Sequence, residues 1–475
     1  VKRRGAERPN GDGRYVVYWM RSARRGRYNY ALQHARDLAL ATDRPLLVVE
    51  TLQVDQPWAS DRSHRFAMEG MQDNSTHFAQ HGVAYHGYVE RRRGAAQTLV
   101  ERLATHACAI VTDRFLPGEV ATSPPGPSPW YAVDCSGLLP LEAAGRAHLT
   151  ARSFRRLLHD RMPEVLQSFP DADPLSRRGP RAPDSPPSPL YRPAGLSEVH
   201  PGRALPSIAR LPLDHGVSPV PGVRGGAGAG RRRLARFTAS ILPEYAAGRS
   251  HPDTGACSGL SAWLNFGHVS AHEAFVQVCR REGWNRDSLI PARAGQREGF
   301  WGMSTSSEAF LDELVTWREL AWNAAAHLPR YRSYASLPAW AQRTLERHAD
   351  DPRPHLYTLE QLEQAQTHDP IWNAAQRELR THGRIHNYLR MLWGKKILQW
   401  TRSPRQALEF MVALNDRHAL DGRNPCSYAG IFWVLGRYDR PWGPERPIFG
   451  QVRYMTSESA QRKLRMARYL QRLAP

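Results

Sequence analysis

The sequence is poor in cysteine, has no long apolar run and carries fewer acidic than basic residues. Its five cysteines lie far apart and form no Cys-x-x-Cys pair, so we expect reduced, mostly buried thiols. No stretch approaches the roughly 18 apolar residues that a transmembrane helix needs, and no apolar run follows the basic N-terminus. These absences exclude a disulfide-stapled fold and predict a cytoplasmic protein with no membrane partner.

Positive charge is present in excess. Lysine and arginine number 65 against 45 aspartate and glutamate residues, which gives a formal net charge of +20. Such a balance favours a polyanionic partner, because cationic side chains that neutralise phosphates release condensed counterions. A coding bias towards arginine produces the same composition, so charge alone leaves nucleic-acid binding open.

The first third of the chain alternates β-rich runs with helical stretches. Expected strands are Tyr15–Met20, Pro45–Glu50, Val83–Val89, Ala109–Thr112 and Trp130–Val133, and expected helices are Tyr30–Ala41 and Gln97–His106. This alternation predicts an α/β domain, residues 14–165, with a Rossmann-like parallel sheet and crossover helices. No glycine fingerprint follows the first strand, so a dinucleotide is not expected there.

Two further regions differ in composition. Residues 171–233 are rich in proline, glycine, serine and arginine, and we interpret them as a linker. Their stretch Gly225–Gly230 does not complete a phosphate-loop motif. Residues 234–475 have helical periodicity and contain eleven of the fourteen tryptophans, which predicts a large all-α domain suited to a planar cofactor. Expected helices are Glu308–Ala326, Leu337–His348, Leu359–Gln366, Asn373–Trp400, Pro404–His418 and Ser457–Leu473.

Several motifs follow one another in the helical region. Tyr245 and Arg249 precede Ser258-Gly-Leu-Ser-Ala-Trp-Leu-Asn-Phe-Gly267, whose hydroxyls and backbone N–H groups suit a pyrophosphate. Taken alone, that stretch is better explained as a capped helix after a turn. Downstream runs are Asp369-Pro-Ile-Trp-Asn-Ala-Ala-Gln376, His382-Gly-Arg-Ile-His-Asn-Tyr-Leu-Arg-Met391, Trp393-Gly-Lys-Lys-Ile-Leu-Gln-Trp400, Leu414-Asn-Asp416, Leu420-Asp-Gly-Arg-Asn-Pro425 and Arg446-Pro-Ile-Phe-Gly-x-x-Arg-Tyr-Met455.

Taken together and in this order, the motifs resemble the photolyase/cryptochrome family, and within it the class II cyclobutane pyrimidine dimer photolyases, as a divergent branch. The resemblance implies light-driven repair of dimers in DNA by electron transfer from excited reduced FAD. It implies a monomer in the cytoplasm that associates with the nucleoid when it is bound to DNA. A second, antenna chromophore of deazaflavin or folate type is left open, because the motifs of the first domain match only in part.

The resemblance also assigns roles to particular residues. It implies contacts to FAD from Tyr245, Ser258, Gly259, Leu260, Ser261, Asn387, Arg390, Asn415 and Asp416. Asn415 is expected to face flavin N5, and Arg390 to pair with a carboxylate beside the ring. Glu313, Trp317, Met391 and Trp433 are expected to receive the flipped-out dimer, with Glu313 protonated so that it donates a hydrogen bond. Trp393, Trp372 and Trp400 are expected to relay an electron to the flavin.

Each role has a structural alternative, since a helical tryptophan is more often a core residue and a glutamate more often a solvated one. His382 and His386 are spaced like a metal pair, but no third ligand is evident, so no metal site is expected. Three alternative functions remain: a cryptochrome-like photoreceptor without repair activity, an enzyme for the (6-4) photoproduct, and a basic nucleic-acid-binding protein with a vestigial flavin fold.

Overall fold

The computed structural model of the protein describes residues 1–114, 127–176 and 197–474. The chain divides into two compact units that interleave along the sequence. Unit 1 comprises Val1–Leu141, Glu164–Ala235 and Leu260–Val278, and unit 2 comprises Glu142–Pro163, Arg236–Gly259 and Cys279–Pro475. Leu260–Val278, which the sequence analysis grouped with the helical region, therefore belongs to the same unit as the sheet.

Unit 1 contains a seven-stranded sheet in the order β1-β6-β5-β2-β3-β4-β7. The five central strands run parallel, and β1 and β7 pair antiparallel at the two edges. The central order is that of a doubly wound fold, so the predicted Rossmann-like topology is confirmed. The strands are β1 (Lys2–Arg4), β2 (Tyr15–Met20), β3 (Leu46–Leu52), β4 (Ala84–Val89), β5 (Ala107–Asp113), β6 (Trp130–Val133) and β7 (Ser197–Val199).

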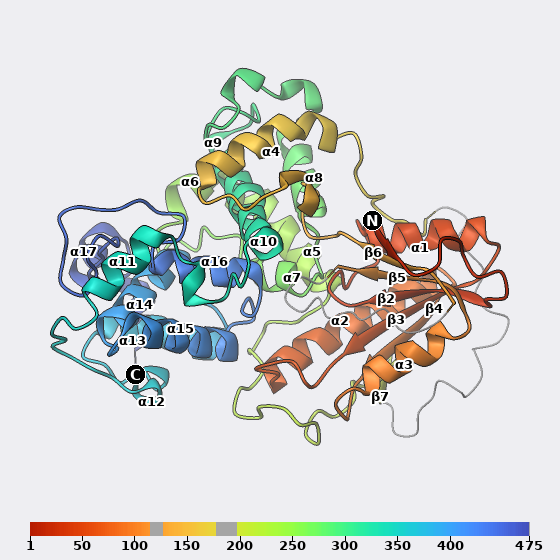
Figure 1. The fold of residues 1–475 in the computed structure, drawn as a ribbon, viewed down its shortest axis with the longest axis horizontal. Helices are drawn as coiled ribbons and strands as arrows, with labels where there is room; N and C mark the ends of the chain where they lie inside the picture. The colour runs from red at the N-terminus through yellow and green to blue at the C-terminus, as the bar shows by residue number, and fades with distance from the viewer. Residues whose placement is uncertain (115–126, 177–196, 475) are drawn as a thin grey trace. The chain divides into compact units, whose positions relative to one another are not determined.

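Alternation along β2 separates the two faces of the sheet, because successive side chains of a strand point in opposite directions. Val16, Tyr18 and Met20 pack with apolar residues of α1 (Tyr30–Ala41). Tyr15, Val17 and Trp19 pack with those of α3 (Ala95–Ala104), and Figure 1 shows these two helices on opposite sides of the strands. Further helices of this unit are α2 (Asp61–Gln80), α5 (Ala227–Arg236), α7 (Ser261–Asn265) and most of α8 (Ala271–Glu282).

Part of the predicted linker is structured. Residues 177–196 of it lie outside the described residues, but α5 begins at Ala227 inside it. The backbone N–H groups of the glycine-rich stretch donate to side chains of the same unit: Gly225 to Glu69, Gly226 to His268 and Gly228 to Asp73. These donors are therefore engaged within the protein rather than open to a phosphate.

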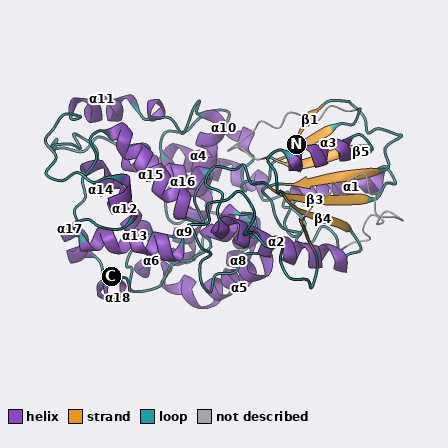
Figure 2. Ribbon diagram, turned by 90° about the horizontal axis from the view of Figure 1, so that it is seen from below, coloured by secondary structure: helices purple, strands orange, loops and turns teal. Residues whose placement is uncertain are grey.

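Unit 2 is helical, as Figures 1 and 2 show, and confirms the predicted all-α region. Its longer helices are α4 (Ala151–Val165), α9 (Thr305–Leu311), α10 (Arg318–His327), α11 (Ala339–Arg347), α13 (Pro370–His382), α14 (Asn387–Gln399), α15 (Pro404–His418), α16 (Pro425–Val434) and α17 (Ser457–Lys463). Shorter ones are α6 (Tyr245–Gly248), α12 (Leu359–Glu363) and α18 (Ala467–Arg472). Single turns are η2 (Leu141–Ala144), η4 (Phe237–Ile241), η5 (Leu242–Glu244), η6 (Arg286–Ser288), η7 (Pro291–Arg293) and η9 (Tyr334–Ser336).

Two predicted helices are divided in the structure. The expected helix Asn373–Trp400 is two helices, because Gly383 ends α13 in the left-handed conformation at φ 63°. The expected helix Glu308–Ala326 contains the π-helical segment η8 (Asp312–Trp317) between α9 and α10. Within the described residues, no helix is long and apolar enough to span a membrane.

Candidate active site

Two tryptophans of unit 2 stack on each other. Trp317 ends η8 and Trp433 lies near the end of α16, and their ring centroids are 4.5 Å apart with an interplanar angle of 17°. Both side chains are only partly buried, and the buried Nε1 of Trp433 has no hydrogen-bond partner in the described chain. A π-helical turn often occurs at functional sites. The structure thus brings together the two tryptophans that the resemblance assigns to the substrate.

Glu313, on the same π-helical turn, forms an ion pair with Arg249. Arg249 follows α6, and its guanidinium lies 5.5 Å from the ring centroid of Tyr245. Burial is the largest single influence on the pKa of Arg249 and lowers it, but the charge and hydrogen bond of Glu313, together with the effect of Tyr245, raise it by more, so the net shift is upwards. Burial, reinforced by Glu313, raises the pKa of Tyr245. The structure thus gives Glu313 a cationic partner, and its predicted role as a hydrogen-bond donor to the substrate stays a prediction.

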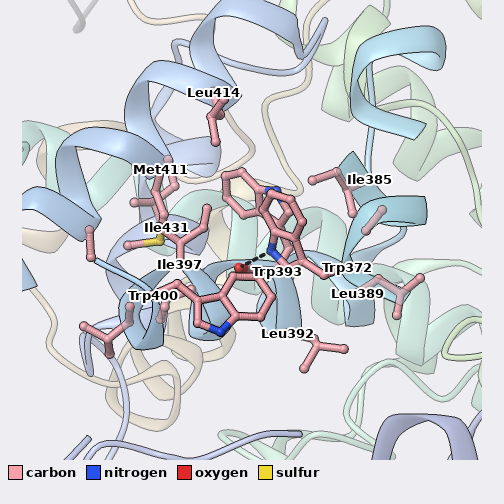
Figure 3. Packing of buried hydrophobic residues seen from close by; sticks show 14 of the residues in the cluster. Trp372, Ile385, Leu389, Leu392, Trp393, Ile397, Trp400, Met411, Leu414 and Ile431 are labelled. Carbon is pink, nitrogen blue, oxygen red and sulfur yellow. Dashed lines mark hydrogen bonds between the residues drawn. The ribbon is translucent and has the colours of Figure 1, made fainter. Parts of the chain in front are cut away.

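The three predicted relay tryptophans share one buried cluster (Figure 3). Trp372 and Trp400 lie with ring centroids 5.5 Å apart at 70°. The Nε1 of Trp372 donates to the carbonyl oxygen of Trp393 at 3.0 Å. The Nε1 of Trp393 donates to Gln376 Oε1 at 2.8 Å. Helices α13 and α14 pack together, so the rings of Trp372 and Trp400 contact each other and Trp393 lies in the same buried cluster.

Asn415 lies at the centre of a buried polar network on α15 and α16. Its Nδ2 donates to Asp416 Oδ1 at 2.9 Å and to Ser427 Oγ at 2.6 Å. Asp416 also accepts from the hydroxyl of Tyr428 at 2.6 Å and from the backbone N–H of Arg423 at 2.9 Å. Burial raises the pKa of Tyr428, and the charge of Asp416 raises it further. Such a network fixes the Asn415 amide in one orientation.

Arg390 and its neighbours occupy the first turn of α14. Arg390 donates from one guanidinium nitrogen to both carboxylate oxygens of Asp421, at 2.9 and 3.1 Å. The expected carboxylate partner of Arg390 is therefore Asp421. Asn387, at the first position of the helix, is exposed, and Met391 is partly buried against the main core of the unit.

The Ser258–Ser261 stretch crosses the boundary between the two units. Ser258 and Gly259 belong to unit 2, with Gly259 in the left-handed region at φ 64°. Leu260 is fully buried in unit 1, and Ser261 begins α7. The role of these four residues stays a prediction.

Sequence reasoning missed the partners of the predicted residues. Arg249 stands in a quoted motif, and Asp421 in another, but neither was assigned a role. Ser427 and Tyr428 lie outside the quoted motifs and carry no local signal. Their pairing with residues 12 positions away depends on how α16 packs against α15.

The architecture is that of photolyases. A bacterial class III photolyase from Agrobacterium tumefaciens has a similar fold, with a TM-score of 0.66 at 16% identity, covering 97% of this chain and 86% of that one. No protein-family model matches the sequence.

Curated relatives give the family. A deoxyribodipyrimidine photo-lyase of Methanothermobacter thermautotrophicus is 32% identical over 100% of this chain and 97% of its own length. The enzymes of that name from Potorous tridactylus and Oryza sativa are also 32% identical, over 97% and 98% of this chain and 81% and 88% of their own lengths. The chain belongs to the deoxyribodipyrimidine photo-lyase family, which confirms the predicted family and enzyme class.

Proposed function

We propose that this chain repairs cyclobutane pyrimidine dimers in DNA, with the electron supplied by excited reduced FAD held in unit 2. The names of the relatives support light-dependent DNA repair. The single observation that carries the dimer assignment is the stacked, partly exposed pair Trp317 and Trp433 on the helices next to Glu313. Two indoles that are partly open to solvent provide faces on which extruded pyrimidines can stack.

The residues of unit 2 fit a flavin. Isoalloxazine presents ring nitrogens and carbonyl oxygens that need directed hydrogen bonds, and the Asn415 amide is held in place by Asp416 and Ser427. Arg390 forms an ion pair with Asp421, so the two side chains can offer polar contacts to the flavin ring without adding net charge. Reduced FAD bound there would supply the electron that opens the cyclobutane ring when it absorbs light. Asn415, Asp416 and Arg390 are the residues that we propose hold it.

The chain's own residues then bind and polarise the substrate. Trp317 and Trp433 stack on the flipped bases, and Met391 contributes apolar surface. Glu313 lies on the same turn as Trp317, and its pair with Arg249 provides a donor near the base carbonyls, where negative charge develops during repair. We propose that Arg249 supplies a hydrogen bond to these carbonyls and that Glu313, its partner in the ion pair, acts beside it on the substrate.

The test of this proposal is repair of an irradiated oligonucleotide by purified protein reconstituted with FAD and reduced chemically. We expect dimers to disappear under blue or near-ultraviolet light and to persist in the dark. Removal of the (6-4) photoproduct with no loss of cyclobutane dimers would overturn the dimer assignment. Monomeric behaviour on size-exclusion chromatography with light scattering is also expected.

A further inference from the structure

Unit 1 holds a cluster of three potential metal ligands, none of which belongs to the candidate active site. His77 and His81 lie one helical turn apart at the C-terminal end of α2, and Asp173 comes from a separate segment. One ligand atom from each of the three residues lies within 4.8 Å of the others. Two imidazoles on one helix face with a carboxylate from elsewhere are a common donor set for first-row transition metals.

Hydrogen bonding selects the ring atom that His81 presents. Its Nδ1 lies 2.8 Å from the carbonyl oxygen of His77, and since a carbonyl only accepts, Nδ1 carries the proton. Nε2 is therefore the ring atom of His81 that is left to face the cluster, and it lies 3.5 Å from Asp173 Oδ2. A histidine whose second nitrogen donates to a backbone carbonyl is oriented as metal-ligating histidines usually are.

His77 presents a second ring nitrogen to the cluster. Its Nε2 is buried and has no hydrogen-bond partner in the described residues. The two imidazole centroids are 4.4 Å apart. Gly26 leaves room for this ring, because a Cβ at that position would lie 2.1 Å from Nε2 of His77.

The carboxylate is positioned independently of the histidines. Arg36 of α1 donates to Asp171 at 3.0 Å and to the carbonyl oxygen of Pro174 at 2.6 Å, which fixes the segment on both sides of Asp173. Asp173 Oδ1 accepts from the backbone N–H of Leu175 at 3.2 Å. Oδ2 is directed to the cluster, where the guanidinium of Arg27 lies 3.5 Å away.

Three potential ligand atoms that lie this close together can share one cation. A proton on His81 would satisfy Asp173, which also lies 3.5 Å from Arg27, but the buried Nε2 of His77 would still have no partner among the described residues. We propose that His77, His81 and Asp173 bind a divalent transition-metal ion of the zinc type. The ion satisfies all three atoms at once and ties the C-terminal end of α2 to the segment around Asp173. Tetrahedral zinc holds its ligand atoms about 3.3 Å apart, since its bonds to nitrogen are about 2.0–2.1 Å, so small side-chain rotations complete the site.

This site departs from the sequence analysis, which expected no metal. His77 and His81 have the i, i+4 spacing that was noticed only for His382 and His386. The third ligand comes from a position 92 residues after His81, so it could not be paired with them before the fold was known.

The experiment is titration of the full, tag-free, chelator-treated chain with Co²⁺, followed by visible d–d absorption, and then competition with Zn²⁺. We expect one ion per chain, weaker binding at lower pH because protons compete for the imidazoles, and a higher midpoint of thermal unfolding with Zn²⁺. His77→Ala, His81→Ala and Asp173→Asn should each weaken binding by at least about tenfold. His106→Ala, an exposed histidine of the same unit, is the control and should bind like the wild type.

Asp173→Asn keeps the fold testable, because the asparagine Oδ1 still accepts from Leu175. Far-ultraviolet circular dichroism of each variant reports whether it is folded. The proposal is overturned if the wild type binds no stoichiometric Co²⁺ or Zn²⁺. It is equally overturned if folded Asp173→Asn and the two histidine variants bind the ion as tightly as His106→Ala does.

Discussion

Single residues of the tryptophan cluster make the electron relay testable. Trp393 is buried, and its backbone carbonyl oxygen accepts a hydrogen bond from Nε1 of Trp372. Trp393→Phe should block photoreduction of oxidised flavin by external reductant, because phenylalanine is much harder to oxidise than tryptophan. Repair by chemically pre-reduced enzyme should largely survive, since that step does not use the relay. Flavin absorption under continuous illumination measures the first effect, and dimer loss the second.

Trp442→Phe is the matched control for the relay. Trp442 lies in the same unit but outside the cluster, where its Nε1 donates to Asp439 at 3.0 Å. It should photoreduce like the wild type. Photoreduction of Trp393→Phe at the wild-type rate would show that the electron takes another route, and the assignment of the relay would be wrong.

Glu313 and Arg249 make the polarisation of the substrate testable. Glu313→Ala should lower the repair yield per photon and leave flavin content and spectrum unchanged, because it removes a group that acts only when charge develops on the dimer. Glu313→Gln should lose less, since its amide can accept from Arg249 and donate to a carbonyl. Glu346→Ala, an exposed glutamate of α11, is the control. Equal yields for wild type and Glu313→Ala would remove Glu313 from the mechanism.

Trp317 belongs to the binding step. Its stacking partner in the structure is Trp433, and we propose that a flipped base takes up this stacking surface. Trp317→Ala should weaken binding to dimer-containing DNA by about 1–3 kcal/mol per stacked base. Binding to undamaged DNA, which depends on phosphate contacts, should change little. Fluorescence anisotropy with matched damaged and undamaged oligonucleotides measures both, and an equal loss on the two would contradict a role in lesion recognition.

At the scale of elements, Gly383 determines where α13 ends. Its φ of 63° is favourable only for glycine, so Gly383→Ala should lower the free energy of unfolding by about 1–2 kcal/mol. Gly430→Ala in α16 should instead raise the free energy of unfolding by about 0.5–1 kcal/mol, since a Cβ there meets no atom within 4 Å. Urea unfolding of both variants gives the comparison. A stable Gly383→Ala protein would mean that the helix break has another cause.

Helices and strands with a clear hydrophobic periodicity were predicted well. Elements whose periodicity and capping residues are weak were not. The strand at Tyr15–Met20 and the helices at Tyr30–Ala41 and Pro404–His418 have the predicted limits. Helix α2 was missed because its sequence is polar at most positions and its capping box uses Ser60 with Ser63, without the usual glutamate. The π-helical turn η8 has no sequence signature, since it arises where tertiary packing inserts one residue into a helix.

The candidate site was predictable as a set of residues but not as a set of pairs. The family motifs gave Glu313, Asn415 and Arg390, each of which has a definite environment in the structure. Their partners lie 64, 12 and 31 positions away in the sequence. These pairings are fixed by helix packing, so neither periodicity nor spacing could show that Glu313 faces an arginine.

At the scale of the whole molecule, we propose the division into residues 14–165, the linker 171–233 and residues 234–475. The composition of the linker predicts that trypsin cleaves first within it. The two fragments should remain associated, because Phe266 of the second fragment packs on Phe66 of α2 within unit 1, with ring centroids 4.9 Å apart. Mass spectrometry and size-exclusion chromatography of the digest test this. Resistance of the whole segment 171–233 to trypsin would contradict the division.

The central claim is light-dependent repair of cyclobutane dimers, and the most direct measurement is dimer content in an irradiated oligonucleotide incubated with the flavin-loaded, fully reduced protein. We expect dimers to be lost under blue or near-ultraviolet light and none to be lost in matched dark samples. Trp317→Ala should slow the loss at limiting protein. If the wild type removes no dimers in the light while its flavin remains bound and reduced, the repair function is wrong, and a photoreceptor function takes its place.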